Sequence, residues 1–185
     1  MDTVGFSHFH RQRWVRVDYH LIAEVESASA TTTSIRSNPL YADTIFGMTR
    51  GWMAEAANEM VADRMLPSGS RIFRWRRVAR GMVVPPSRHL SNGLVHGAGS
   101  VQDTVNFALI MGWRRIVIAG VDLVGNDYFW MSSEAGKIPT ERWAQADTVL
   151  ASFRLWRELA AADGIELLTY SASSLLAEVL PIFEW

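Results

Sequence analysis

The chain has 185 residues, 49% of them hydrophobic, and its 18 basic and 19 acidic residues give a net charge of −1, which suits one globular domain and gives no reason to expect nucleic acid as a partner. The absence of cysteine excludes disulfides, thiolate metal sites and a cysteine nucleophile. Because we find neither a signal-like amino terminus nor a run of about 18 apolar residues, we expect a cytoplasmic protein with no membrane span.

The amino-terminal half alternates short strand candidates with loops and one helix. We expect strands at residues 3–6, 19–26 and 72–76, a Ser/Thr/Ala-rich loop at 27–34, an irregular stretch at 40–48 and a helix at 50–65. Glu24 and Glu26 would share one face at the end of the second strand, either as functional groups or as a solvated face. His8 and His10 form an H-x-H pair without a nearby carboxylate, which favours surface histidines over a metal site.

A basic cluster surrounds the third strand candidate. Its arginines are Arg71, Arg74, Arg76, Arg77, Arg80 and Arg88. Arginine recognises phosphate or carboxylate through two parallel hydrogen bonds, so the cluster could hold an anionic ligand. Its interleaving with tryptophan is also compatible with single-stranded nucleic acid, and a solvated edge strand or an interface is the third interpretation.

The carboxyl-terminal half contains the clearest pattern. A glycine-rich turn at residues 96–99 is followed by a helix, a nearly all-apolar strand at 115–121, a long helix at 140–162, a strand at 165–170 and a short terminal helix. This order predicts a central strand at 115–121 with the strand at 165–170 as its parallel neighbour. We therefore expect an α/β fold: a single Rossmann-like domain over residues 1–185, with a mostly parallel sheet and helices on both faces.

The turn and the apolar strand together suggest a ligand site. A helix that begins at Gly99 and Ser100 would direct unpaired backbone N–H groups toward an anion, and the apolar strand would deliver Asp122 to the same edge. A long loop at residues 123–139 would then be a lid or a substrate-binding loop. The alternative is that Ser100 and Asp103 only cap the helix and that Asp122 only ties down a loop.

These same segments carry a family resemblance. Gly99-Ser100-Val101, Met111-Gly112-Trp113, the run from Arg115 to Asp122, and the segments Gly164–Leu168 and Ser173–Leu176 resemble the bacterial CMP-sialic-acid sialyltransferases of the glycosyltransferase family 42 type. They also resemble a related group that includes archaeal hydroxymethylpterin diphosphokinases. The resemblance covers roughly residues 95 to 180.

The resemblance implies a Rossmann-like fold, a nucleotide-activated sugar as donor and a transfer that needs no metal or other cofactor. Gly99, Ser100 and Asp122 would line the nucleotide site, with Ser7 where the family often has an asparagine, and Tyr128 would steady the leaving phosphate. The family's general base is a histidine at the start of the long helix. Here Asp147 is the nearest carboxylate to that position, and the family's first strand with its Gly-rich turn has no counterpart at the amino end.

Three functions follow as hypotheses. The leading one is a glycosyltransferase that moves a sugar from a CMP-type donor to a surface glycan acceptor in polysaccharide synthesis, with Asp147 and Tyr128 as catalytic residues and a homo-oligomer as a further possibility. The second is a diphosphotransferase of the pterin kinase type, which would hold Mg²⁺ through carboxylates such as Asp122 and Glu24. The third is a non-catalytic module that binds a nucleotide sugar.

Overall fold

The structure of this protein is a computed structural model that describes residues 1–25, 27–51, 54–124 and 143–184. The chain forms two compact units, residues 1–77 and 78–185. In each unit strands pair in parallel and alternate with helices, so the predicted α/β Rossmann-like fold with a mostly parallel sheet is confirmed. None of the helices in the described ranges is long and apolar enough to cross a membrane.

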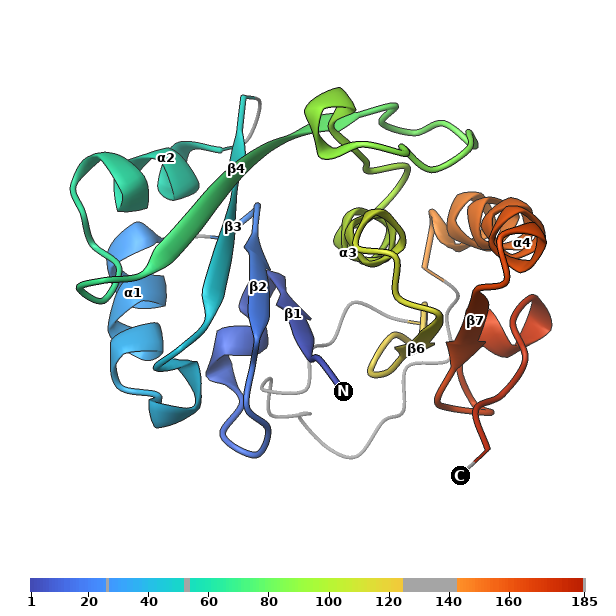
Figure 1. Cartoon of the computed structure of the whole chain (residues 1–185), viewed down its shortest axis with the longest axis horizontal. Helices are drawn as coiled ribbons and strands as arrows, with labels where there is room; N and C mark the ends of the chain where they lie inside the picture. The colour runs from blue at the N-terminus through green and yellow to red at the C-terminus, as the bar shows by residue number, and fades with distance from the viewer. Residues whose placement is uncertain (26, 52–53, 125–142, 185) are drawn as a thin grey trace. The chain divides into compact units, whose positions relative to one another are not determined.

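The first unit is built on parallel strands that follow one another in sequence order (Figure 1). They are β1 (Val4–Phe6), β2 (Tyr19–Ile22), β3 (Ile45–Arg50) and β4 (Arg71–Val78). The register pairs Val4 with Tyr19, Tyr19 with Ile45 and Ile45 with Arg71, so the strands begin at one edge of the sheet. The segments that leave the strands, beginning with the 3-10 helix η1 (Ser7–Arg11), therefore gather at the opposite, carboxyl edge.

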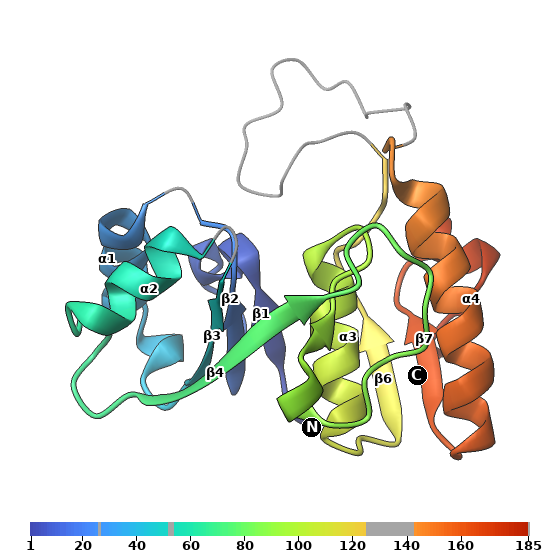
Figure 2. The ribbon, with the colours of Figure 1, turned by 90° about the horizontal axis from the view of Figure 1, so that it is seen from above.

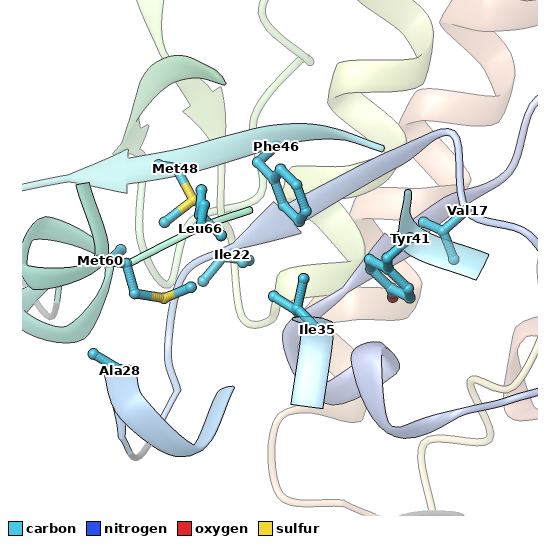
Figure 3. Close-up of a cluster of buried hydrophobic side chains, with 10 residues drawn as sticks. Val17, Ile22, Ala28, Ile35, Tyr41, Phe46, Met48, Met60 and Leu66 are labelled. Atoms are coloured by element: carbon cyan, nitrogen blue, oxygen red, sulfur yellow. The ribbon is translucent and has the colours of Figure 1, made fainter. Parts of the chain in front are cut away.

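Two helices cover one face of this sheet. α1 (Ala28–Arg36) connects β2 to β3 and α2 (Glu55–Ala62) connects β3 to β4, as parallel pairing requires. Their apolar sides meet the strands in a buried cluster (Figure 3), whose members are Val17, Ile22, Ala28, Ile35, Tyr41, Phe46, Met48, Ala57, Met60 and Leu66. Each large side chain in it contributes on the order of 1.5–3 kcal/mol by leaving water.

The prediction of a loop at residues 27–34 is wrong, because α1 lies there. Its buried residues are Ala28, Thr31, Thr32 and Ile35, the i, i+3, i+4, i+7 spacing of one helix face. Two of these four are threonines, so the face does not register as apolar in the sequence. The helix is stabilised instead by packing on the sheet and by Ser27, whose Oγ accepts from the backbone N–H of Ala30 at 3.2 Å.

The prediction of an irregular stretch at residues 40–48 is also wrong, since β3 begins at Ile45. Gly47 interrupts the apolar pattern in the sequence, but the structure requires glycine there. A Cβ at Gly47 would lie 2.6 Å from the ring of Phe73 and 2.9 Å from Leu21. In place of the helix expected at residues 50–65, the structure has the shorter helix α2. Trp52 and Met53, which were predicted on its apolar face, lie outside the described residues.

The second unit alternates helices with short strands (Figure 2). Its elements are β5 (Leu94–Val95), α3 (Ser100–Ile110), β6 (Arg115–Ile118), α4 (Ala146–Ala162), β7 (Glu166–Thr169) and the 3-10 helix η5 (Leu175–Glu178). β5 lies beside Val78, the last residue of β4, whose carbonyl accepts from the N–H of His96 at 3.0 Å. β6 and β7 pair in parallel from Arg115 opposite Glu166 to Ile118 opposite Thr169, which confirms the predicted pairing.

β6 is not the fully covered central strand that its apolar sequence predicts. It pairs with β7 in a two-stranded sheet, and only alternate residues, Ile116 and Ile118, are buried. Val117 is 38% exposed and Arg115 is exposed, so one face of the strand is solvated. A β-branched run is equally compatible with a half-buried strand, because valine and isoleucine favour extended backbone whether or not both faces are covered.

Replacing Ile22 of β2 by alanine should destabilise the protein by about 2–5 kcal/mol, because this side chain is fully buried in the cluster and its loss leaves a cavity. The matched control is Ile72→Ala in β4. Because Ile72 is 42% exposed, this substitution should lower the free energy of unfolding much less. Urea unfolding followed by circular dichroism measures both, and equal losses would contradict the assigned core.

Candidate functional site

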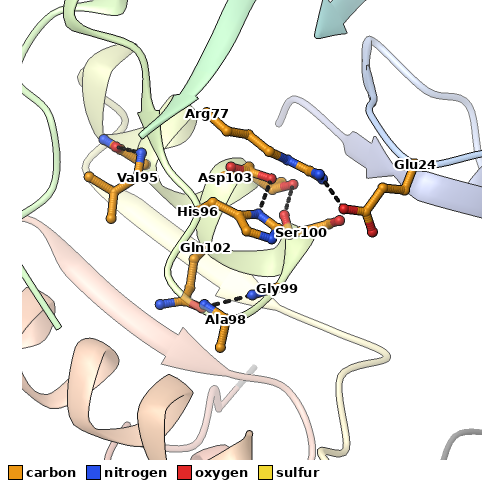
Figure 4. Close-up of polar contacts among 11 residues, drawn as sticks. Glu24, Arg77, Val95, His96, Ala98, Gly99, Ser100, Gln102 and Asp103 are labelled. Atoms are coloured by element: carbon orange, nitrogen blue, oxygen red, sulfur yellow. Dashed lines mark hydrogen bonds and ion pairs between the residues drawn. The ribbon is translucent and has the colours of Figure 1, made fainter. Parts of the chain in front are cut away.

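The turn before α3 is held by the side chain of Gln102, which is fully buried. Its Oε1 accepts from the backbone N–H of Ala98 at 2.7 Å and of Gly99 at 3.1 Å (Figure 4). The N–H of Gly99 also approaches the carbonyl of His96 at 3.1 Å. The N–H of Gly99, at the helix start that the sequence assigned to an anion, is therefore already bonded within the protein.

The two glycines of this turn have different roles. Gly97 has φ +53°, and a Cβ there would lie 2.0 Å from Nε2 of Gln102, so only glycine fits. Gly99 has φ −165°, extended backbone that any residue adopts. A Cβ at Gly99 would meet only the ring of Trp143, at 3.4 Å, so this glycine is not required by the backbone.

A buried histidine–aspartate pair lies at the same turn. Nδ1 of His96 and Oδ2 of Asp103 are 2.9 Å apart, and both side chains are buried (Figure 4). From the sequence, we assigned only a capping role to Asp103 and no role to His96. A histidine and an aspartate that flank a glycine turn at the start of a helix were the available signal, but only the folded turn brings them into contact. An aspartate that orients an imidazole is also the arrangement of many general bases.

The predicted residues after β6 lie near this turn through Trp143. The ring of Trp143 faces Gly99, and its backbone N–H donates to the carbonyl of Leu123 at 3.0 Å. The start of α3, the segment after β6 and the residues before α4 are thus in contact. Ser100, in the first turn of α3, is half-buried.

Asp122 does not stand at the end of a strand, because β6 ends at Ile118. Its side chain is exposed, and its carbonyl accepts from the N–H of Leu175 at 3.2 Å. The preceding carbonyl, of Val121, accepts from Oγ of Ser174 at 2.5 Å. The backbone here is fixed by the terminal turn, which leaves the carboxylate at the surface.

The remaining predicted residues have varied positions. Asp147 lies in the first turn of α4 and is exposed. Tyr128 and the rest of the expected substrate loop from residue 125 onward lie outside the described residues, as does Glu26. Ser7 belongs to the first unit, where it has φ +49° and its carbonyl is 3.0 Å from Nε2 of His20.

The basic cluster is partly used within the protein. Arg71 donates to the carbonyl of Asp43 at 3.1 Å, Arg74 donates to the carbonyl of Thr49 at 2.9 Å, and Arg77 pairs with Glu24 (Figure 4). These contacts support the interpretation of an edge strand. In the ranges that the structure describes, no group of three or more histidine and acidic side chains is arranged to hold a metal ion.

A second group of buried polar residues lies in the first unit. It includes His10, which the sequence predicted to lie at the surface. His10 is 2% exposed and His20 is fully buried. Their rings are stacked, with 6.1 Å between the ring centroids. Burial lowers the pKa of His10 from 6.5 to about 3, with further lowering by His20, His8 and nearby arginines. Burial likewise lowers the pKa of His20 to about 4, although its hydrogen bond to Ser7 acts in the opposite direction.

Comparison with known protein families, curated proteins and solved structures finds no match for this chain.

Replacing Gly97 by alanine should destabilise the protein by at least about 1–3 kcal/mol, because the new Cβ would adopt a strained φ and collide with Gln102. Gly99→Ala is the matched control and should be close to neutral. Chemical denaturation of the two variants measures the difference, and an equal response at both positions would contradict the geometry of the turn.

The two buried histidines should make stability fall as the pH decreases below about 6.5. Below pH 6.5 both histidines become protonated in the unfolded chain but stay neutral in the folded protein. This difference persists until the pH approaches the folded-state pKa, about 4 for His20 and about 3 for His10. The expected loss is about 1.4 kcal/mol per pH unit for each histidine. Urea unfolding between pH 5 and 7 measures the slope, and His10→Phe should reduce it. A slope unchanged in that variant would show that His10 is not buried in its neutral form.

Proposed function

We propose that the chain binds a nucleotide-activated sugar at the start of α3 and transfers the sugar to a hydroxyl of a glycan acceptor. The observation that supports this proposal is the contact of Trp143 with both Gly99 and Leu123. It joins the start of α3, the segment after β6 and the start of α4, and the carboxyl edge of parallel strands is where α/β proteins bind their ligands. The resemblance of residues 95 to 180 to CMP-sialic-acid sialyltransferases supports the choice of a CMP-type donor.

The proposed roles follow from the chemistry of the transfer. The acceptor oxygen attacks the anomeric carbon while a base takes its proton, and the bond from that carbon to the phosphate oxygen breaks to release the nucleotide. The positive end of α3 at Ser100 would stabilise the charge that develops on the phosphate. Gly99 has no side chain that could stand between the helix start and the phosphate, and the exposed carboxylate of Asp122 would accept hydrogen bonds from the donor.

Two groups are candidates for the base. Asp147 lies in the first turn of α4, where the family has its histidine, and is exposed to solvent. His96 is the second candidate, because Asp103 orients its ring. A carboxylate base gives a rate that is constant across roughly pH 6 to 8, whereas an imidazole base gives a rate that rises through the neutral range. Tyr128, outside the described residues, keeps its proposed role at the leaving phosphate.

A panel of CMP, UDP, GDP and ATP with and without Mg²⁺ tests donor binding by the rise in melting temperature. We expect CMP to stabilise the protein without Mg²⁺. Gly99→Val should abolish this effect, because its branched side chain would collide with the ring of Trp143 and crowd the start of α3. Stabilisation only by ATP with Mg²⁺ would favour the diphosphotransferase, and no stabilisation by any nucleotide would contradict the proposal.

Asp147→Asn should lower the rate of sugar transfer by about a hundredfold or more, the usual effect of removing a positioned base. Glu158→Gln, an exposed substitution further along α4, is the matched control and should leave the rate unchanged. Full activity in Asp147→Asn with a large loss in His96→Gln would assign the base to His96. Donor binding without transfer to any acceptor would favour the binding module.

A further inference from the structure

Two arginines lie directly opposite each other toward the carboxyl ends of β3 and β4, which are neighbouring strands of the first unit (Figure 1). Arg50, the last residue of β3, pairs in register with Arg76 of β4. Both residues are exposed. Like charges that lie directly opposite each other in a sheet repel and reduce its stability. This pair therefore costs stability unless a negative charge compensates it.

Arg74 brings a third guanidinium to the same face of the sheet. It alternates with Trp75 and Arg76 along β4, so Arg74 and Arg76 extend from one face of the strand. Its Nη2 donates to the carbonyl of Thr49 at 2.9 Å and to Oδ1 of an α2 side chain, that of Asn58. Partial burial lowers the pKa of Arg74, and the nearby charge of Arg50 lowers it further. We call Arg50, Arg74 and Arg76 the arginine triad.

No carboxylate neutralises the arginine triad in the ranges that the structure describes. Within these ranges Arg50 and Arg76 form neither an ion pair nor a hydrogen bond, and both hydrogen-bond partners of Arg74 are uncharged. Arg77, the next residue of β4, differs because it pairs with Glu24. The positive charge of the triad is therefore not used in an ion pair within the described part of the chain.

The acidic residues of α2, which packs on β3, do not pair with the triad either. Glu55 and Glu59 line a hollow beside the start of α1. Neither carboxylate forms an ion pair with a described arginine, and neither acts on the pKa of Arg74, which responds to Arg50 alone among the charged groups. The carboxyl ends of β3 and β4 thus present positive charge without a compensating group of α2.

The donors of the triad indicate the kind of ligand. A guanidinium presents a planar fork of N–H groups that matches two oxygens of a phosphate or a carboxylate. A single carboxylate has only two oxygens in one plane, whereas the oxygens of a phosphate point in several directions and can accept from three guanidinium groups. Trp75, between Arg74 and Arg76 in the sequence, is 1% exposed and cannot stack on a base. The triad therefore suits a compact phosphate group better than single-stranded nucleic acid.

We propose that Arg50, Arg74 and Arg76 bind the phosphate group of a small phosphorylated ligand at the carboxyl edge of the first unit. The phosphate would lie between the opposed charges of Arg50 and Arg76 and replace their repulsion by two attractive contacts. All three residues belong to the first unit. The inference therefore does not depend on the nucleotide site proposed at the start of α3.

Titration of the full chain with pyrophosphate, followed by calorimetry and by the melting temperature, tests this site. We expect pyrophosphate to bind and to stabilise the protein, and Arg50→Gln and Arg76→Gln each to weaken this binding at least tenfold. Citrate, which offers carboxylates of similar total charge, should bind at least tenfold more weakly than pyrophosphate. The proposal is wrong if pyrophosphate does not bind, if both variants bind it normally, or if citrate or a single-stranded oligonucleotide binds the triad more tightly.

Arg71→Gln is the matched control, because it removes the same charge from the opposite end of the same strand. Arg71 is about 16 Å from Arg76 along an extended strand, beyond the screening length of about 8 Å at physiological ionic strength. Pyrophosphate binding measured at that ionic strength should therefore change less than about twofold. A loss equal to that in Arg76→Gln would show general electrostatic attraction instead of a site.

The urea midpoint without ligand separates a binding role from a structural one. Arg76→Gln removes one of two opposed charges, so the midpoint should stay equal or rise. A lower midpoint together with unchanged pyrophosphate binding would show that Arg76 only stabilises the strand.

Glu26→Gln tests a carboxylate that follows β2 in the sequence and lies outside the described residues. Its removal should change the affinity for pyrophosphate by less than about twofold. A tenfold gain in affinity would show that this carboxylate already neutralises the triad, which would overturn the proposal.

The same variants separate this site from the nucleotide site. Gly99→Val should leave pyrophosphate binding intact while it removes the stabilisation by CMP, and Arg76→Gln should do the reverse. Stabilisation by CMP that is lost in Arg76→Gln and kept in Gly99→Val would assign the nucleotide to the triad and contradict the site at α3. Failure of one proposal is therefore distinguishable from failure of the other.

Discussion

Parallel pairing is the constraint on which the structure depends. A strand that pairs in parallel with the strand before it must return across the sheet, so every such pair requires a connection long enough for a helix or an equivalent segment. In the first unit this places α1 and α2 between successive strands, and in the second it places α4 between β6 and β7. The same geometry directs the segments that leave the strands to one edge in each unit. The candidate sites lie at these edges for that reason.

Both edges contain buried polar side chains, but the two groups are satisfied differently. At the start of α3, Oε1 of Gln102 accepts from two backbone donors and His96 has Asp103 as a partner, whereas Nε2 of Gln102 has no partner among the described residues. In the first unit, among the residues that the structure describes, the ring of His20 has a hydrogen bond to the carbonyl of Ser7 and the ring of His10 has none. A buried polar group with partners stabilises a local conformation, whereas one without partners costs stability and is retained only for another benefit.

The turn at residues 96–99 shows how a structural role and a binding role can share one short segment. Gly97 provides the positive φ and the space that the side chain of Gln102 requires. Gly99 has extended backbone, and a Cβ there would contact the ring of Trp143 at 3.4 Å. The side-chain oxygen of Gln102 accepts hydrogen bonds from the backbone N–H groups of Ala98 and Gly99, in the place that an anion would take. Any anion at this helix start would therefore interact with the first turn of α3 itself, and the preceding turn would serve as its support.

The sequence by itself determined the α/β class and the parallel pairing of β6 with β7, because apolar runs and a helix between them are local patterns. It did not reveal α1, since the buried face of that helix is half threonine and is stabilised by the sheet. It did not reveal β3 either, because Gly47 interrupts the apolar pattern. Glycine is required there because a side chain would collide with Phe73, which is distant in sequence. The residues at the two edges divide in the same way. Gly99, Ser100 and Asp122 could be selected from motifs, whereas the pairing of His96 with Asp103 and the burial of His10 depend on where the chain folds back. Only the tertiary structure decides which polar groups lose water and which of them gain a partner.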